Sequence, residues 1–124
     1  MPIKLNRYRT KNLSILKCIG EVNFPETIEA LGSFFKTPTK NCLWDMSSLD
    51  GNRWSSEEIK KISKYSAIHC KTPPEGKTAF AAPSDVDFGI SRMYESFARM
   101  DGFPWEVRTF RSMNEALRWL GEGD

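Results

Sequence analysis

The sequence predicts an α/β fold with a mostly parallel sheet, about four helices and the element order ββαβαβαβα. Apolar stretches of strand length alternate with amphipathic stretches of helix length from residue 13 onward. This alternation is typical of parallel strands that are joined by right-handed helical crossovers. The first two strands follow each other directly, so we expect them to form an antiparallel pair at one edge of the sheet.

The opening segment predicts a hairpin, with strands at 3–9 and 13–19 and a polar turn at 10–12. The first 20 residues carry basic residues and no acidic one: Lys4, Arg7, Arg9, Lys11 and Lys17. Bases along a strand fit an edge strand that is protected against pairing with another sheet. The alternative is a face for anionic lipid or nucleic acid, and pairing across the exposed edge would make a homodimer.

A helix and a central strand follow this hairpin. Pro25 suits a first helical turn. Behind it, apolar residues recur at helical spacing, namely Ile28, Leu31 and Phe35. Pro38 ends the helix, because the residue before a proline is pushed out of the α region. The apolar run 42–46 then predicts a strand in the middle of the sheet.

Three further helices each begin at a serine whose side chain accepts a hydrogen bond from a free backbone amide. Ser55 opens the first of them, with Glu58 completing a capping box. Ser84 opens the longest helix and Ser112 opens the last one. We place strands between these helices, over 78–82 and 105–110.

The longest helix carries a stripe that we expect to face the core, formed by Val86, Ile90, Met93, Phe97 and Met100. Asp85 and Asp87 lie in its first turn, where negative charge is favoured by the helix dipole. Glu95 and Arg99 are four residues apart, a spacing that predicts a weakly stabilising ion pair.

The composition is that of a single globular domain over residues 1–124. Hydrophobic residues make up 40% and charged residues 27% of the chain, which excludes a fibrous or disordered protein. No apolar run approaches a membrane-spanning length, and the polar amino terminus lacks the apolar stretch of a secretory signal. Cys18, Cys42 and Cys70 form no CxxC pair. We therefore expect a cytoplasmic protein without a disulfide framework.

The common catalytic and cofactor motifs are missing from the sequence. It contains no GxxxxGK[ST] or GxGxxG phosphate loop and no GxSxG nucleophile elbow. His69 is the only histidine, and the end of a helix is a favourable place for it without any chemistry. A metal site or a histidine-based mechanism would need further partners. We expect no catalytic residue, no cofactor, no metal and no nucleic-acid partner.

Asp45 is the acid at the carboxyl end of the predicted strand 42–46. Open α/β sheets bind their ligands at this end of the strands. The alternative is that the Asp45 carboxylate accepts hydrogen bonds from backbone amides of the following loop.

Aromatic residues make up 12% of the chain, and most of them must lie in the core. Trp54 precedes a helix cap, Phe88 departs from the inward stripe and Trp105 follows a turn. Together with Met93, these side chains would line an apolar groove for a lipophilic ligand or a partner helix. The alternative is that each of them fills the core.

Several stretches resemble the SpoIIAA-like family of small bacterial STAS-type proteins, in the STAS/Sec14-like superfamily. They are AFAAPSD at 79–85, FGISRMYE at 88–95, VRTFR at 107–111 and EALRWL at 115–120. Gly20-Glu21 and Leu43-Trp44-Asp45 are similar too, so the resemblance covers about residues 3–121. It implies a STAS-like fold, which agrees with the element order predicted from the residues.

The resemblance implies binding or regulation and no catalysis. Sporulation members are anti-sigma-factor antagonists controlled by phosphorylation of a serine at the start of the helix after the acid-bearing strand. Ser55 and Ser56 occupy about that place, without the family's preceding aspartate and following glycine. Related proteins are also similar to lipid carriers of the Sec14 type, which implies an apolar groove beside the helix over 85–101.

We therefore expect a non-enzymatic STAS-like binding or regulatory module that acts through a protein partner or a small apolar ligand. Two alternatives remain open. One is a lipid or fatty-acid carrier with an apolar groove, and the other is a phosphorylation-controlled partner switch of the anti-sigma-factor-antagonist type. The basic amino terminus adds peripheral contact with an anionic membrane to these expectations.

Overall fold

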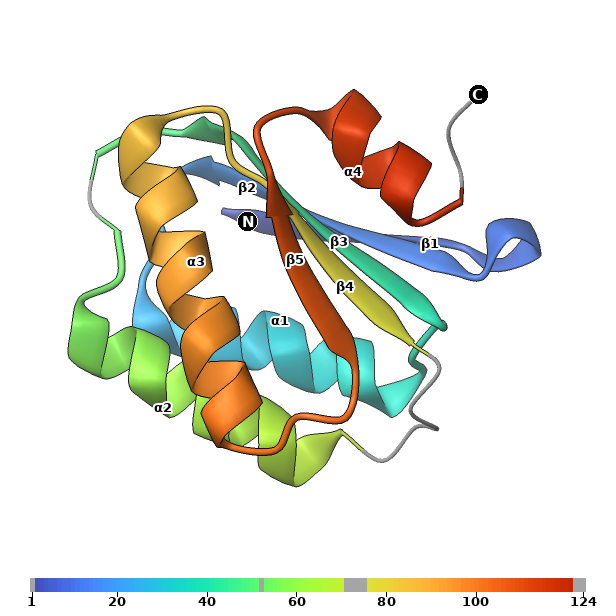
Figure 1. The fold of residues 1–124 in the computed structure, drawn as a ribbon, viewed down its shortest axis with the longest axis horizontal. Coiled ribbons are helices and arrows are strands. Elements are labelled where there is room, and N and C mark those ends of the chain that lie inside the picture. The colour runs from blue at the N-terminus through green and yellow to red at the C-terminus, as the bar shows by residue number, and fades with distance from the viewer. Residues whose placement is uncertain (1, 52, 71–75, 122–124) are drawn as a thin grey trace.

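The computed structural model describes residues 2–51, 53–70 and 76–121 (Figure 1). Its strands are β1 (Ile3–Tyr8), β2 (Leu13–Gly20), β3 (Asn41–Leu49), β4 (Lys77–Ala81) and β5 (Glu106–Phe110). They form one sheet in this same order, with β1 antiparallel to β2 and every later pair parallel. The predicted α/β class, mostly parallel sheet and antiparallel edge pair are confirmed.

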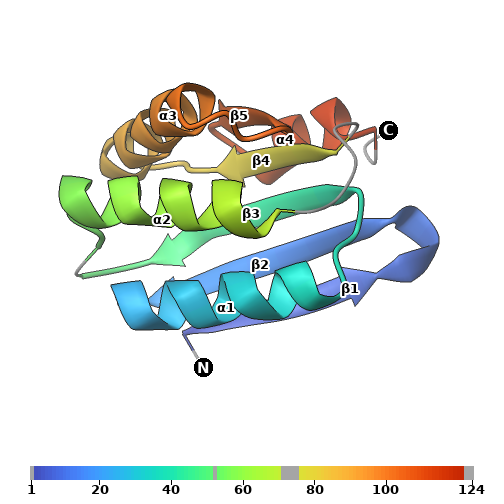
Figure 2. The same cartoon turned by 90° about the horizontal axis from the view of Figure 1, so that it is seen from below.

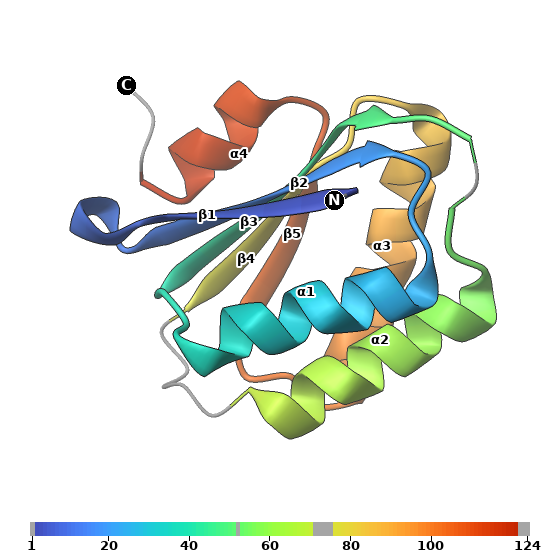
Figure 3. The ribbon, with the colours of Figure 1, turned by 180° about the vertical axis from the view of Figure 1, so that it is seen from behind.

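The helices are α1 (Phe24–Lys36), α2 (Ser56–His69), α3 (Asp85–Met100) and α4 (Met113–Trp119), and a 3-10 turn over Arg9–Lys11 joins β1 to β2. Each parallel strand pairs with the next one in sequence, so right-handed crossovers place α1, α2 and α3 on the same face. Helix α4 follows the last strand and covers the opposite face (Figures 2 and 3). The predicted order of elements is confirmed.

The predicted helix starts are confirmed in atomic detail. Ser55 accepts a hydrogen bond from the backbone N–H of Glu58, and the Glu58 carboxylate accepts one from the N–H of Ser55. Ser84 and Ser112 cap α3 and α4 in a similar way, because each side chain accepts a hydrogen bond from the backbone N–H three residues later. An asparagine that the sequence analysis did not select, Asn23, forms the capping box of α1.

The larger core lies between the sheet and the three helices α1, α2 and α3. In α1 the deepest aromatic ring is that of Phe34, which is 1% exposed, and the predicted Phe35 is only half-buried. The smaller core lies under α4, where Leu43, Ala79 and Ala81 are fully buried. The short side chains of β4 let this helix approach the sheet closely.

The predicted inward stripe of α3 is wrong at both ends. Val86 is 60% exposed and Met100 is 79% exposed. The buried positions are instead mostly polar or small: Asp87, Ser91, Tyr94, Glu95 and Ala98. This helix packs against both α2 and β5, and its polar side chains are buried there because they find hydrogen-bond partners.

Strand β1 forms one edge of the sheet, as the basic residues of the hairpin predict. Arg7 donates hydrogen bonds to the backbone oxygens of Ser33 (2.5 Å) and Thr37 (3.0 Å) at the carboxyl end of α1. It therefore ties the edge strand to the helix beside it. No helix in the described residues has the length and the apolar content that crossing a membrane requires.

Candidate functional site

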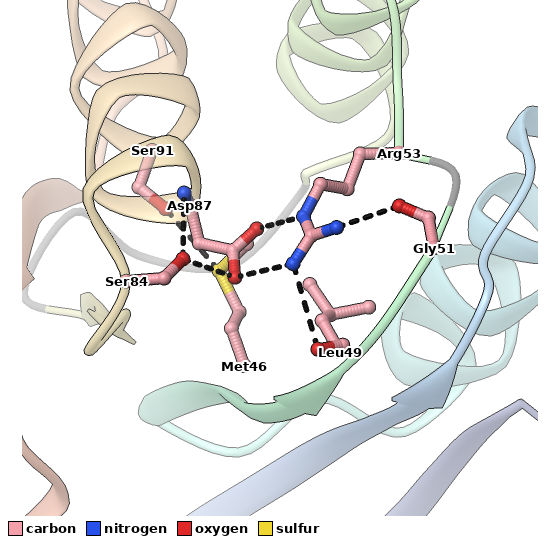
Figure 4. A network of polar contacts seen from close by, with 7 residues as sticks. All are labelled: Met46, Leu49, Gly51, Arg53, Ser84, Asp87 and Ser91. Carbon is pink, nitrogen blue, oxygen red and sulfur yellow. Dashed lines mark hydrogen bonds and ion pairs between the residues drawn. The ribbon is translucent and has the colours of Figure 1, made fainter.

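A network of polar contacts lies where the carboxyl ends of β3 and β4 meet the amino-terminal ends of α2 and α3 (Figure 4). Arg53 makes a two-point ion pair with Asp87, with Nε 2.5 Å from Oδ1 and Nη2 3.2 Å from Oδ2. The same guanidinium donates to the backbone oxygens of Gly51 at 2.6 Å and Leu49 at 3.5 Å. One side chain therefore fastens the β3–α2 connection to α3.

Asp87 is only 2% exposed, so its charge requires partners within the protein. Besides Arg53, the hydroxyl of Ser84 donates to Asp87 Oδ2 at 2.8 Å. That hydroxyl also accepts the backbone N–H of Asp87 at 3.1 Å, as the cap of α3. The hydrogen bond to Asp87 raises the pKa of Arg53 above its ordinary value, with a further contribution from the Asp87 charge. The partners of the Asp87 carboxylate are side chains of this network. This arrangement fits a role in holding the start of α3 in position rather than in proton transfer.

Asp45 lies in the last residue pair between β3 and β4, opposite Ala81, and is 7% exposed. Its Oδ1 accepts hydrogen bonds from the backbone N–H of Ser47 at 3.0 Å and from the Ser47 hydroxyl at 2.6 Å. Strand β3 continues to Leu49, so the amide that Asp45 caps belongs to the strand and not to the loop. A ligand at Asp45 stays a prediction.

Asp45 and the Arg53–Asp87 pair belong to different faces of the sheet. Side chains alternate between the two faces along a strand, and the neighbours of Asp45, Trp44 and Met46, lie in the core under α1, α2 and α3. Asp45 therefore faces the side that carries α4. The structure does not bring the predicted acid together with the ion pair.

The cysteines are free thiols, and Cys18 and Cys42 are buried. Burial raises the pKa of the Cys18 thiol to about 12, and the nearby charges of Asp45 and Asp87 add to the effect. Burial also raises the pKa of Cys42. Both side chains are protonated at neutral pH, whereas a thiolate is the form that attacks a substrate or binds a metal.

Ser55 and Ser56 are exposed at the amino-terminal end of α2. The Ser55 hydroxyl accepts a hydrogen bond from the backbone N–H of Glu58 at 3.2 Å, so it is used by the helix cap. Ser56 is the first residue of the helix. The predicted position of both serines at the start of this helix is confirmed, and their phosphorylation stays a prediction.

Trp54 is 9% exposed and donates its indole N–H to the hydroxyl of Thr27 at 2.7 Å, which ties the segment before α2 to α1. It lines an apolar cavity of about 40 Å³ together with side chains from the sheet and from α1, α2 and α3. For comparison, an engineered apolar cavity that binds benzene has a volume of roughly 150 Å³. The lipid-carrier function stays a prediction, and in this conformation the cavity is too small for a lipid chain.

The other residues of the predicted apolar groove have separate surroundings. Phe88 is half-buried, with the guanidinium of Arg111 4.0 Å from the centre of its ring. Trp105 is 4% exposed and meets Phe34 edge to face, with ring centres 6.0 Å apart. Met93 is half-buried against the larger core. The core-filling alternative describes Trp54 and Trp105 best, because both are buried.

A polar groove of about 620 Å³ lies between α3 and β5, and we call it the α3–β5 groove. Its lining includes Arg92, Arg99 and Arg108, together with Trp105 and Val107. The predicted ion pair of Glu95 with Arg99 is wrong. Glu95 instead accepts a hydrogen bond from the hydroxyl of Thr109 and pairs with Arg92 at 3.7 Å.

His69 lies at the carboxyl end of α2, as predicted. Its ring stacks on that of Tyr65 with centres 4.0 Å apart, and its Nδ1 is 2.9 Å from the backbone oxygen of Tyr65. In the part of the chain that the structure describes, no three His, Cys, Asp or Glu side chains gather as a metal site would require.

Sequence reasoning missed two arrangements of charged side chains, the Arg53–Asp87 pair and the α3–β5 groove. Arg53 and Asp87 are 34 residues apart, and no sequence pattern links them. The arginines of the α3–β5 groove left a weak signal, because Arg92 and Arg99 are two helical turns apart and therefore lie on one face of α3.

No protein-family model matches this chain, and no curated protein matches it either. The resemblance to STAS-type proteins therefore rests on the motifs and the order of elements alone. The structure supports the α/β class with a mostly parallel sheet, and membership of the STAS family stays a prediction.

Proposed function

We propose that this chain is a non-enzymatic STAS-type module that binds a protein partner at the end of the sheet where α2 and α3 begin. The Arg53–Asp87 ion pair is the observation that carries this proposal. It ties Arg53, just before α2, to α3, so the exposed start of α2 is held beside the start of α3. A surface that is ordered before binding loses less conformational entropy when a partner docks.

The chemistry of this region supports binding over catalysis. The buried carboxylate of Asp87 is occupied by Arg53 and Ser84, and Asp45 Oδ1 accepts two hydrogen bonds from Ser47. General acid–base catalysis requires a group that can reach a substrate proton. The side chains that remain exposed are hydroxyls and carboxylates at the start of α2, such as Ser55, Ser56 and Glu57.

Site-specific photo-cross-linking in cells of the source organism tests the proposal. A photoreactive phenylalanine analogue replaces Ser56 at the start of α2, or Arg118 on the exposed side of α4 as a matched control. We expect a discrete cross-linked protein from position 56 and not from position 118. Arg53→Lys should weaken that cross-link, because lysine keeps the charge but cannot make the two-point contact with Asp87.

Two results would contradict the proposal. The first is an identical set of cross-links, or none, from positions 56 and 118. The second is a robust catalytic turnover by the purified protein that is lost in Asp45→Asn or in His69→Ala, because the protein would then be an enzyme that uses these side chains in catalysis.

Phosphorylation at the start of α2 is a second candidate function, favoured by the exposure of Ser56 at the first helical position. A phosphate at a helix amino terminus is stabilised by the free backbone amides and the helix dipole. We expect Ser56→Asp to change the yield of the partner cross-link, measured with the photoreactive group moved to position 57. Equal yields from Ser56→Asp, Ser56→Ala and the unchanged protein would argue against the switch.

A further inference from the structure

The outer edge of β5 carries backbone groups that no other described strand uses. Strand β5 ends the sheet and pairs with β4 (Figures 1 and 2). The backbone oxygen of Phe110 accepts the N–H of Ala82, just after β4, at 2.8 Å. In a parallel ladder, alternate residues turn both backbone groups to the same neighbour. Phe110 and Arg108 therefore face β4, and the backbone groups of Val107 and Thr109 face away from the sheet.

One acidic and one basic side chain lie along this edge, on the same face of the sheet. Side chains alternate between the two faces along a strand. Val107 packs against the larger core, whereas Phe110 packs against the smaller core under α4. Glu106 and Arg108 therefore share the α4 face with Phe110. Both are exposed, and neither has an ion-pair partner among the described residues.

These positions become self-complementary when a second copy pairs with β5 about a two-fold axis, because such strands run antiparallel. The outward backbone groups must then lie opposite one another. If Val107 lies opposite Val107, Glu106 of each copy lies opposite Arg108 of the other. If Val107 lies opposite Thr109, the two Arg108 side chains meet, and if Thr109 lies opposite Thr109, Arg108 meets Phe110. Opposite charges across strands are stabilising and like charges are destabilising, so the charges select the first of these registers.

We infer that two copies of this chain associate through β5, so that one sheet runs across both. The two Val107 residues exchange backbone hydrogen bonds at the axis. On either side of them, Glu106 of one copy pairs with Arg108 of the other. Such pairs lie where the backbones exchange no hydrogen bonds, which is where opposite side chains come closest. The interface uses no residue of the proposed partner site at the start of α2, so the inference does not depend on the proposed function.

The two edges of the sheet differ in how well they suit this association. Beside β5 the α3–β5 groove of about 620 Å³ leaves room for a strand. Its exposed Arg92 and Arg99 are long enough to turn their charges to solvent. The opposite edge, β1, carries Lys4 and Arg7 and no acid, and Arg7 is held by the end of α1. A second copy would therefore find complementary charges along β5 and none along β1.

Analytical ultracentrifugation of the purified chain in low salt, from micromolar to millimolar concentration, tests the inference. We expect the mass to rise from 14.2 kDa to twice that value. Arg108→Glu or Glu106→Arg alone should raise the dissociation constant by about tenfold or more, which corresponds to about 1.4 kcal/mol, because each makes both cross-strand pairs like-charged. The two substitutions together should restore the dimer, since acid and base again lie opposite each other. Arg118→Glu, a charge reversal on exposed α4, should change the constant by less than about twofold.

Two backbone measurements separate strand pairing from simple charge attraction. Val107→Pro removes the outward N–H at the axis without touching the ladder to β4, and an edge strand tolerates proline at such a position. It should abolish the dimer while the thermal melting curve stays cooperative. In the unchanged protein, the amides of Val107 and Thr109 should become protected from hydrogen exchange as the concentration is raised.

Three results would overturn the inference. The first is the mass of a single chain at every concentration, which would leave this edge free for a different protein. The second is a combined Glu106→Arg and Arg108→Glu variant that dimerises no better than either single variant, because the two side chains would then not face each other. The third is a dimer that Val107→Pro leaves unchanged, which would place the interface away from β5.

Discussion

The Arg53–Asp87 pair differs from the other ion pairs of the described residues in its burial. The side chain of Asp87 is 2% exposed and that of Arg53 is 20% exposed, whereas Arg111 and Asp85 are 49% and 94% exposed. A charge removed from water is costly unless its partner stays in place. At the scale of single residues, stability should therefore depend on the first pair far more than on the second.

Asp87→Asn and Asp85→Asn make the same change in the same turn of α3. We expect Asp87→Asn to lower the free energy of unfolding by about 2–3 kcal/mol, because it removes the counter-charge of a largely buried guanidinium. Asp85→Asn should change it by less than about 0.5 kcal/mol. Urea denaturation measures both values. Equal effects of the two substitutions would mean that the ion pair does not hold α3 in place.

The buried thiols predict a loss of stability in alkaline solution. The folded state holds the pKa of Cys18 at about 12, above the ordinary value of 9.0, so the unfolded chain releases this proton first as the pH rises. The contribution of this thiol to the free energy of unfolding is therefore fully present below pH 9. It falls between about pH 9 and 12, by up to about 1.4 kcal/mol per pH unit. Denaturation curves from pH 8 to 10.5 measure the fall. Cys18→Ala should make it shallower, and an unchanged slope would contradict this origin.

At the scale of elements, helix starts could be predicted and buried helix faces could not. A cap is local, because Ser55 and Glu58 are three residues apart and satisfy each other. The buried face of α3 depends on neighbours that are distant in sequence. Ser91 donates to the sulfur of Met46, and Glu95 is buried because it meets Thr109 of β5. A periodicity of apolar residues carries no information about such partners.

Two glycines provide a prediction at this scale. Gly89 lies within α3, and a Cβ atom there would meet nothing within 4 Å. Gly89→Ala should stabilise the protein by about 1 kcal/mol, because alanine is the better helix former. At Gly76, just before β4, a Cβ would lie 2.3 Å from the ring of Trp105. Gly76→Ala should destabilise by about 1–3 kcal/mol. Thermal melting measures both, and shifts of the same sign would contradict the packing described.

At the scale of the whole molecule, the mostly parallel sheet followed from the alternation of strands and helices, while the order of the strands and the position of charged side chains did not. Because each parallel strand pairs with the next one in sequence, right-handed crossovers place α1, α2 and α3 on one face. The α3–β5 groove requires in addition that Glu95 turn toward Thr109 and leave Arg99 unpaired. Sequence spacing suggested the opposite, since a spacing of four residues favours the Glu95–Arg99 pair.

The smaller core, between the sheet and α4, can be tested separately. Leu120, 5% exposed, packs there, and Asn41 donates its side-chain N–H to the Leu120 backbone oxygen at 3.1 Å. Leu120→Ala should cost about 2–4 kcal/mol of unfolding free energy, because it removes buried apolar contacts. Arg118→Ala, on the exposed side of the same helix, should be close to neutral. A small effect of Leu120→Ala in guanidinium denaturation would mean that α4 is dispensable.

The order of the strands bears on how the protein is made. Each strand pairs only with those immediately before and after it along the chain, so no late strand has to be inserted between two earlier ones. A polypeptide emerging from the ribosome can therefore extend the sheet at a single growing edge, one crossover at a time. Contacts between segments that are near in sequence form fastest, and synthesis would deliver them here in the order in which they are used.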